Sequence, residues 1–133
     1  MEFTMYFENG IPKGTSQQKG EFVRGGHIYH YKKPSVALAH HLYVTKASEF
    51  APERPSEAPV RLELEFIYSV KDQRLWGHYK PSKPDADNIC KELIDSLVDA
   101  GHFVQDSRIV DLRVIKKFGE RASIRVFWEE IQE

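Results

Sequence analysis

Residues 60–70 read Val-Arg-Leu-Glu-Leu-Glu-Phe-Ile-Tyr-Ser-Val and carry the clearest period of two in the chain. Apolar side chains alternate with Arg61, Glu63 and Glu65, which is the pattern of a β-strand that buries one face and exposes the other. The stretch therefore predicts one strand of a half-buried sheet, whose partner strands must come from the neighbouring sequence.

Weaker strand patterns lie on both sides of this stretch. Apolar residues alternate in three of them, and one has two short β-prone runs; in chain order they are residues 2–8, 22–31, 110–114 and 122–128. Gly25-Gly26 between the two short runs predicts a hairpin. Phe118-Gly119-Glu120-Arg121 predicts a second hairpin, which would join the last two strands.

Two stretches have helical character. The first begins at Pro34 or Ser35, where proline suits a first helical position, and continues to about Phe50. The second extends from near Asp87 to Ala100, and a glycine follows it as a stop signal. Proline-broken and polar loops separate these elements. Their order predicts one α+β domain over residues 1–133, with a mainly antiparallel mixed sheet and two principal helices packed on one side.

Length and composition agree with one globular domain. The chain has 133 residues, of which 41% are hydrophobic and 29% charged, so collagen-like, coiled-coil and disordered classes are excluded. No apolar run approaches the about 18 residues of a membrane span, and Met1-Glu2-Phe3-Thr4 has no features of a secretory signal. The single cysteine, Cys90, excludes an internal disulfide. These features predict a cytoplasmic protein.

Charge is nearly balanced overall but uneven along the chain. The 19 basic and 20 acidic residues give a net charge of −1, which excludes a uniformly basic nucleic-acid-coating protein. Residues 10–46 nevertheless contain six basic residues and one acidic residue. Such a basic segment suits a polyanionic partner. A lysine-rich solvated surface is the alternative on charge alone.

Residues 83–97 read Lys-Pro-Asp-Ala-Asp-Asn-Ile-Cys-Lys-Glu-Leu-Ile-Asp-Ser-Leu and contain the candidate chemistry. Asp85 or Asp87 can cap the predicted helix. At about 100° per residue the apolar side chains share one face, and Asp87, Lys91 and Asp95 form a stripe beside it. This stripe would place shielded but accessible groups at the margin of the core.

Carboxylates at this position suggest a metal centre. Asp85 and Asp87 can converge only if the loop bends or a cation bridges them, and a turn after the helix would bring Asp106 towards its start. Hard oxygen ligands select Mg²⁺ or Mn²⁺, so the set fits a phosphodiester-cleaving site. The alternatives are a helix cap, a surface ion pair of Lys91 and a simple turn at Asp106.

The order of these motifs resembles the RusA family of Holliday-junction resolvases. The resemblance is carried by Lys83-Pro84-Asp85-Ala86-Asp87-Asn88-Ile89-Cys90-Lys91, by Asp95-Ser96-Leu97, by Asp106-Ser107-Arg108-Ile109-Val110 and by Lys116-Lys117-Phe118-Gly119. It implies a homodimeric Mg²⁺-dependent endodeoxyribonuclease, with Mn²⁺ as an alternative cofactor. Such an enzyme resolves four-way junction DNA by paired symmetric nicks in DNA recombination and repair. The resemblance also implies a phage or prophage origin.

The resemblance implies roles for individual residues. Asp85, Asp87 and Asp106 would bind the metal, and Lys91 would be needed for catalysis without binding it. The chain has Gln105 where members often have an acidic residue before the third aspartate, and it has fewer arginines near its start. We expect contacts to the DNA from basic and polar residues that precede the candidate catalytic residues in the chain: Lys13, Ser16, Lys19, Lys80 and Lys83.

Two other functions remain consistent with these residues. The chain can be a branched-DNA-binding protein whose catalytic site is weakened, since Gln105 already differs from the family pattern. It can also be a nuclease that acts on flaps or other branched nucleic acids. Metal-dependent cleavage of a panel of branched substrates separates these functions from junction resolution.

Overall fold

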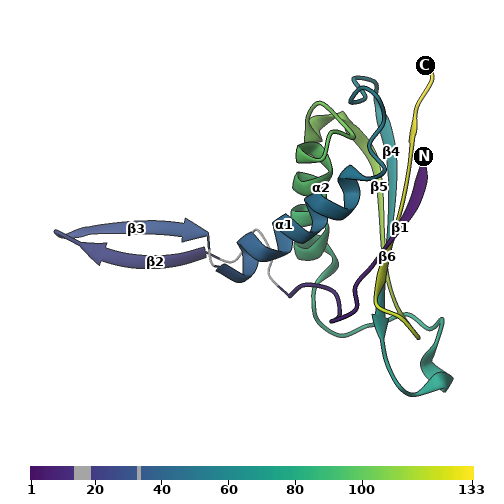
Figure 1. Cartoon of the computed structure of the whole chain (residues 1–133), viewed down its shortest axis with the longest axis horizontal. Coiled ribbons are helices and arrows are strands. Elements are labelled where there is room, and N and C mark those ends of the chain that lie inside the picture. Colours follow the sequence, from purple (N-terminus) through teal and green to yellow (C-terminus); the bar gives the residue numbers. More distant parts are fainter. Residues whose placement is uncertain (14–18, 33) are drawn as a thin grey trace.

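A computed structural model describes residues 1–13, 19–32 and 34–133. The strands and helices follow the predicted order, and two helices cover one face of a sheet that Figure 1 shows edge-on. In chain order the elements are β1 Glu2–Tyr6, β2 Lys19–Arg24, β3 His27–Lys32, α1 Pro34–Ser48, β4 Val60–Ser69, η1 Gln73–Leu75, α2 Ala86–Asp99, η2 Asp106–Arg108, β5 Ile109–Gly119 and β6 Ser123–Glu130.

Strand β4 lies inside the main sheet, as its alternation predicts. Within the described residues the sheet has the strand order β1-β6-β4-β5, and β4 pairs antiparallel with β6 and parallel with β5. Its alternate residues Leu62, Leu64 and Phe66 are fully buried against the helices. The side chain of Arg61 forms ion pairs with Asp111 of β5 and Glu129 of β6 on the other face. The predicted mainly antiparallel mixed sheet with helices on one side is confirmed.

The predicted hairpin at Phe118-Gly119-Glu120-Arg121 is wrong. β5 and β6 are not neighbours, because β4 lies between them and pairs with both. The connection therefore crosses the end of β4. Gly119 accommodates this crossing closely, since a Cβ built there would overlap the side chain of Ile67. Alternation predicts that a segment is a strand but carries no information about its partner, which explains the error.

The other predicted hairpin is confirmed. β2 and β3 pair antiparallel around Gly25 and Gly26, whose positive φ angles of 60° and 82° suit the tight turn. This hairpin projects away from the sheet beyond the start of α1 (Figure 1). It forms a separate two-stranded sheet.

Helix α2 packs its apolar stripe on the sheet. Ile89, Leu93 and Leu97 are buried, as helical spacing predicts. Its end is marked by Gly101, which has a φ of 92° that a glycine adopts readily. Over the described ranges, no helix combines the length and the apolar character needed to cross a membrane.

Candidate active site at the start of helix α2

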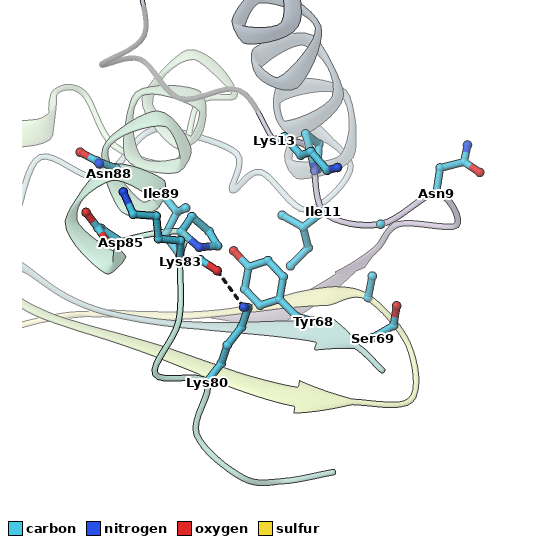
Figure 2. Close-up of a pocket in the computed structure, with 14 residues that line it drawn as sticks. Asn9, Ile11, Lys13, Tyr68, Ser69, Lys80, Lys83, Asp85, Asn88 and Ile89 are labelled. Carbon is cyan, nitrogen blue, oxygen red and sulfur yellow. Dashed lines mark hydrogen bonds between the residues drawn. The ribbon is translucent and has the colours of Figure 1, made fainter. Parts of the chain in front are cut away.

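Two lysines fix the loop that leads into α2. Lys80 Nζ donates hydrogen bonds to Ser82 Oγ at 2.8 Å and to the Lys83 carbonyl at 2.7 Å (Figure 2). Lys116 Nζ, from β5, donates to the carbonyls of Ser82 and Pro84, each at 2.7 Å. Because an ammonium group donates several hydrogen bonds at once, these two side chains define the path of the chain up to Asp85.

Asp85 occupies the N-cap position of α2 without using its side chain as a cap. Its backbone is extended, its carbonyl accepts from the amides of Asn88 and Ile89, and its carboxylate makes no capping hydrogen bond. Asp87 lies in the first helical turn, and both side chains are exposed. Two carboxylates thus lie at the positive end of the helix dipole, where negative charge is favoured.

Lys91 is held in a carboxylate environment further along the helix. Its Nζ lies 2.8 Å from Asp95 Oδ1 and 3.8 Å from Asp106 Oδ2. The hydrogen bond to Asp95, with a smaller contribution from Asp106, raises the pKa of the Lys91 ammonium group. Lys91 therefore stays charged at neutral pH. Of its two neighbours in the predicted stripe, the ion pair is formed with Asp95.

The three predicted metal ligands do not form one cluster in the part of the chain that the structure describes. Over residues 1–13, 19–32 and 34–133, no group of three or more His, Cys, Asp or Glu side chains is arranged to hold a metal ion. Asp106 lies beside Lys91, and Lys91 lies six positions after Asp85, about 9 Å further along the helix at 1.5 Å per residue. Joint metal binding by Asp85, Asp87 and Asp106 stays a prediction.

The donor chemistry at the helix start nevertheless fits a hard divalent cation. Asp85 and Asp87 supply exposed carboxylate oxygens, and the Asp85 carboxylate is not committed to the helix cap. Mg²⁺ is commonly bound through one or two carboxylates together with substrate phosphates, rather than in a cage made only of protein. The carboxylate pair of Asp85 and Asp87, together with a phosphate of the substrate, would match this mode of binding.

A cavity of about 610 Å³ opens beside Asp85. Figure 2 shows the cavity between α2 with its preceding loop, the segment after β1 and the end of β4. The labelled residues around it include Ile11, Lys13, Tyr68, Lys83, Asp85 and Asn88. The cavity thus connects the candidate catalytic carboxylate with three lysines predicted to contact DNA: Lys13, Lys80 and Lys83.

The predicted DNA-contacting residues differ in their surroundings. Lys13 and Lys83 are exposed at the cavity. Lys80 is committed to the loop, and partial burial together with repulsion from Lys116 lowers its pKa. Ser16 and the side chain of Lys19 lie outside the part of the chain that the structure describes.

The comparison with known proteins assigns the family. Residues 9–127 match the family model described as Endodeoxyribonuclease RusA. The chain belongs to the RusA family. It is therefore an endodeoxyribonuclease, a hydrolase of phosphodiester bonds in DNA, and the resemblance noted in its sequence is confirmed.

Two relatives match over almost their whole length. The crossover junction endodeoxyribonuclease rusA of Lactococcus phage r1t is 29% identical, and the alignment covers 98% of this chain and 100% of that protein. The uncharacterized protein YqaN of Bacillus subtilis (strain 168) is 28% identical, with 98% of this chain and 96% of that protein covered. The family match spans the segment from Lys83 to Asp106, and so, by their coverage of this chain, do both alignments.

Two residues of the site have structural roles that the sequence analysis did not predict, although Lys116 belongs to a motif that carries the family resemblance. Lys116 lies in a Lys-Lys pair that is typical of a solvated strand end, yet its ammonium group holds the loop before Asp85. Tyr68 ends an apolar alternation and is expected to pack, yet its hydroxyl lies at the cavity. Only the parallel pairing of β4 with β5, in which Phe66 is opposite Lys116, brings these residues to the loop.

Proposed function

We propose that this endodeoxyribonuclease resolves four-way DNA junctions by nicking two opposed strands, in DNA recombination and repair. The observation that carries the proposal is the loop held by Lys80 and Lys116, which presents Asp85 at the start of α2 with its carboxylate free of the cap. Membership of the RusA family and the name of the phage relative support a junction as the substrate.

The proposed cofactor is Mg²⁺, with Mn²⁺ as the alternative, held by Asp85, Asp87 and Asp106. When bound, such an ion polarises a phosphoryl oxygen and lowers the pKa of a coordinated water. The exposed carboxylates of Asp85 and Asp87 would orient it at the helix start. Asp106 would be the one ligand from outside α2. It lies 3.8 Å from Lys91, so the proposed metal ligand and the proposed catalytic lysine are neighbours.

Lys91 would act on the reacting phosphate through its charge. Asp95 orients the ammonium group at 2.8 Å and raises the pKa of Lys91, so a positive charge is present without any proton uptake. A preorganised cation stabilises negative charge that develops on phosphate oxygens. The amino end of α2 favours the same phosphate through its free amide groups.

Binding of the junction would rest on backbone contacts and on symmetry. Lys13 and Lys83 present exposed charges beside the carboxylates, and Ser16, Lys19 and Lys80 complete the proposed set. Contacts of this kind position a nucleic acid without reading its sequence. We propose a homodimer, because a twofold axis would match the near-twofold symmetry of a four-way junction and place one site at each nicked strand.

The decisive test is cleavage of a synthetic four-way junction in Mg²⁺ by three single variants, Asp85→Asn, Asp87→Asn and Asp106→Asn. Each variant should still bind the junction but cleave it much more slowly. The loss in rate should exceed the about 10–100-fold that follows mutation of a residue that only hydrogen-bonds a metal ligand. Asp72→Asn is the matched control, because Asp72 is paired with Arg74 away from α2. A variant that cleaves as fast as the wild type removes that residue from the site.

A substrate panel distinguishes the proposal from its alternatives. Four-way, three-way, flap and linear DNA are compared under the same conditions, with two symmetric nicks expected only on the four-way junction. Binding without cleavage of any substrate would favour a weakened enzyme, for which the exposed Gln105 next to Asp106 is the specific motive. Preferred cleavage of flaps would assign the other alternative.

A further inference from the structure

The cavity beside Asp85 has no part in the proposed cleavage chemistry. Its volume of about 610 Å³ lies within the roughly 300–1,000 Å³ of sites that enclose small organic molecules. Four separate chain segments line it: the residues after β1, the end of β4, the loop with the first turn of α2, and Ala122 before β6. Its position next to a candidate catalytic carboxylate means that any occupant would lie beside the reacting phosphate.

The lining of the cavity combines an apolar floor with hydrogen-bond donors. Ile11, Ile89 and Ala122 are buried and contribute the floor. Lys13 and Lys83 contribute exposed ammonium groups at the opening. A ligand that matches this lining is flat or apolar in one part and carries oxygen or nitrogen acceptors and negative charge in another. A nucleotide has both parts.

Tyr68 adds a donor inside the cavity. Its hydroxyl is buried and has no hydrogen-bond partner among the described residues, although a buried polar group is normally paired. Figure 2 shows the ring between Ile11 and Lys83, with the hydroxyl directed away from the sheet. Burial raises the pKa of Tyr68 to about 12, so the group is a protonated donor at neutral pH. The unpaired hydroxyl therefore lacks an acceptor that a ligand could supply.

We propose that this cavity receives a nucleobase of the bound DNA, from a nucleotide that flanks the cleaved phosphate. Tyr68 would donate a hydrogen bond to an acceptor of the base, and Lys13 and Lys83 would contact its phosphates. This inference rests on the proposed function. Unstacking a base costs least where its pairing is already weak, and the branch point of a junction is such a place. The cavity would thereby give a shape-selective enzyme a preference for particular bases.

The first test follows the base directly. Four-way junctions carry 2-aminopurine at single positions flanking the cleaved phosphate, and fluorescence is measured with the wild-type protein in EDTA, which prevents cleavage. A several-fold rise at one position, absent from linear duplex of the same sequence, is expected when that base leaves the stack. Unchanged fluorescence at all flanking positions in a complex shown to be bound overturns the inference.

The second test removes only the hydroxyl, by Tyr68→Phe. The ratio of kcat/KM between junctions that differ in the flanking base should change by about fivefold, the effect of one hydrogen bond. Tyr79→Phe is the matched control, because Tyr79 is two-thirds exposed, packs under Lys117 and does not line the cavity. An identical base preference in the wild type and in Tyr68→Phe overturns the role of the hydroxyl.

The two tests separate failure of the inference from failure of the proposed function. If the wild type cleaves no junction but cuts another DNA, the proposed function fails. If it cleaves the junction while the flanking bases stay stacked, only the inference fails. In a third experiment, free deoxynucleoside monophosphates are added to the complex of protein and 2-aminopurine junction. If they abolish the rise in fluorescence, the cavity binds a free nucleotide, and its assignment to a base of the DNA strand is overturned.

Discussion

Lys116 is the residue on which the position of Asp85 most directly depends. Its stem crosses from β5 to the loop, and its ammonium group donates to the carbonyls of Ser82 and Pro84 at 2.7 Å. Because the two carbonyl groups bind the same ammonium group, the backbone between them has little freedom to rotate. The position of the following residue, Asp85, is restricted as a result. Lys116 is thus a positioning residue, which acts on the reaction only through the backbone before Asp85.

Replacement of Lys116 by methionine tests this dependence. Lys116→Met keeps the stem and removes the charge, so the loop should lose its fixed path and kcat should fall by about tenfold or more, since misplacement of about 1 Å can cost 100-fold. KM for the junction should change much less, because the exposed lysines that we propose to bind its phosphates are untouched. Single-turnover and steady-state cleavage of a four-way junction separate the two parameters.

The adjacent lysine provides the control for this variant. Lys117 lies over the ring of Tyr79 at 5.4 Å and makes no contact with the loop carbonyls in the described structure. Lys117→Met should therefore retain the wild-type kcat. Equal losses in the two variants would show that the effect comes from lost positive charge on β5, and wild-type turnover in Lys116→Met would refute the positioning role.

At the scale of elements, helix α1 is joined to helix α2 by one histidine. His40 Nδ1 lies 2.9 Å from Glu92 Oε1, and His40 Nε2 lies 2.7 Å from Asp99 Oδ2. Glu92 is fully buried, and its second oxygen has no partner among the described residues. Both ring nitrogens thus face carboxylates, and Nδ1 also lies 3.1 Å from Ser96 Oγ of α2. The contact fixes α1 against α2.

Removal of His40 should therefore leave the buried carboxyl group of Glu92 without its partner on α1. We expect His40→Leu to lower the free energy of unfolding by about 3 kcal/mol, measured by urea denaturation at pH 7. The double variant His40→Leu/Glu92→Leu should recover most of this loss, because an apolar pair replaces the ionic one without an orphaned carboxylate. His41→Leu, at the exposed neighbouring position, is the control and should change stability little. A double variant no more stable than His40→Leu would contradict this explanation.

The contact between α1 and α2 also shows which features of a helix its own sequence does not predict. The apolar spacing of α2 correctly predicts Ile89, Leu93 and Leu97 as its buried face. The same spacing treats Glu92 as a polar residue outside that face, yet it is buried. Its burial depends on where α1 crosses α2 and on a histidine 52 residues earlier in the chain. Such a pair is a property of tertiary packing, which the periodicity of a single helix does not contain.

At the scale of the whole molecule, the sequence predicts the parts of the site better than their assembly. The motif from Lys83 to Lys91 is local, so its loop and helix follow from proline, capping and helical spacing. The position of Asp106 depends on the turn after α2 and on the pairing of β5 with β4. The sequence instead predicts that β5 pairs with β6 in a hairpin, so it does not give the relation of Asp106 to Asp85.

His102 connects several parts of the molecule in the core. Trp128 Nε1 of β6 donates to His102 Nδ1 at 3.1 Å, which leaves Nε2 to donate to the Ala47 carbonyl of α1 at 2.9 Å. The ring also stacks on Phe3 of β1 with centroids 5.1 Å apart. The ring is fully buried. This pattern requires the neutral ring, because a protonated Nδ1 could no longer accept the bond from Trp128.

The pH dependence of stability tests this interpretation of His102. Burial, opposed in part by the bond to Ala47, lowers the pKa of His102 below its ordinary value of 6.5. Above 6.5 the ring is neutral in both states; as pH falls below 6.5 the unfolded chain takes up a proton that the folded chain excludes. The free energy of unfolding should therefore decrease as pH falls through 6.5 and continue to do so until the folded pKa is reached.

Urea denaturation of the wild type at several pH values between 7.5 and 5 measures how steeply the free energy of unfolding changes with pH. Both limits lie about one unit or more from the ordinary pKa of histidine. His102→Gln should be less stable at pH 7.5 but lose stability less steeply on acidification, because glutamine does not titrate. His41→Gln should keep the wild-type slope, since His41 lies exposed on α1. A slope in His102→Gln equal to that of the wild type would place the acid sensitivity elsewhere. The expected difference would show that one neutral imidazole ties the stability of β1, α1 and β6 to pH.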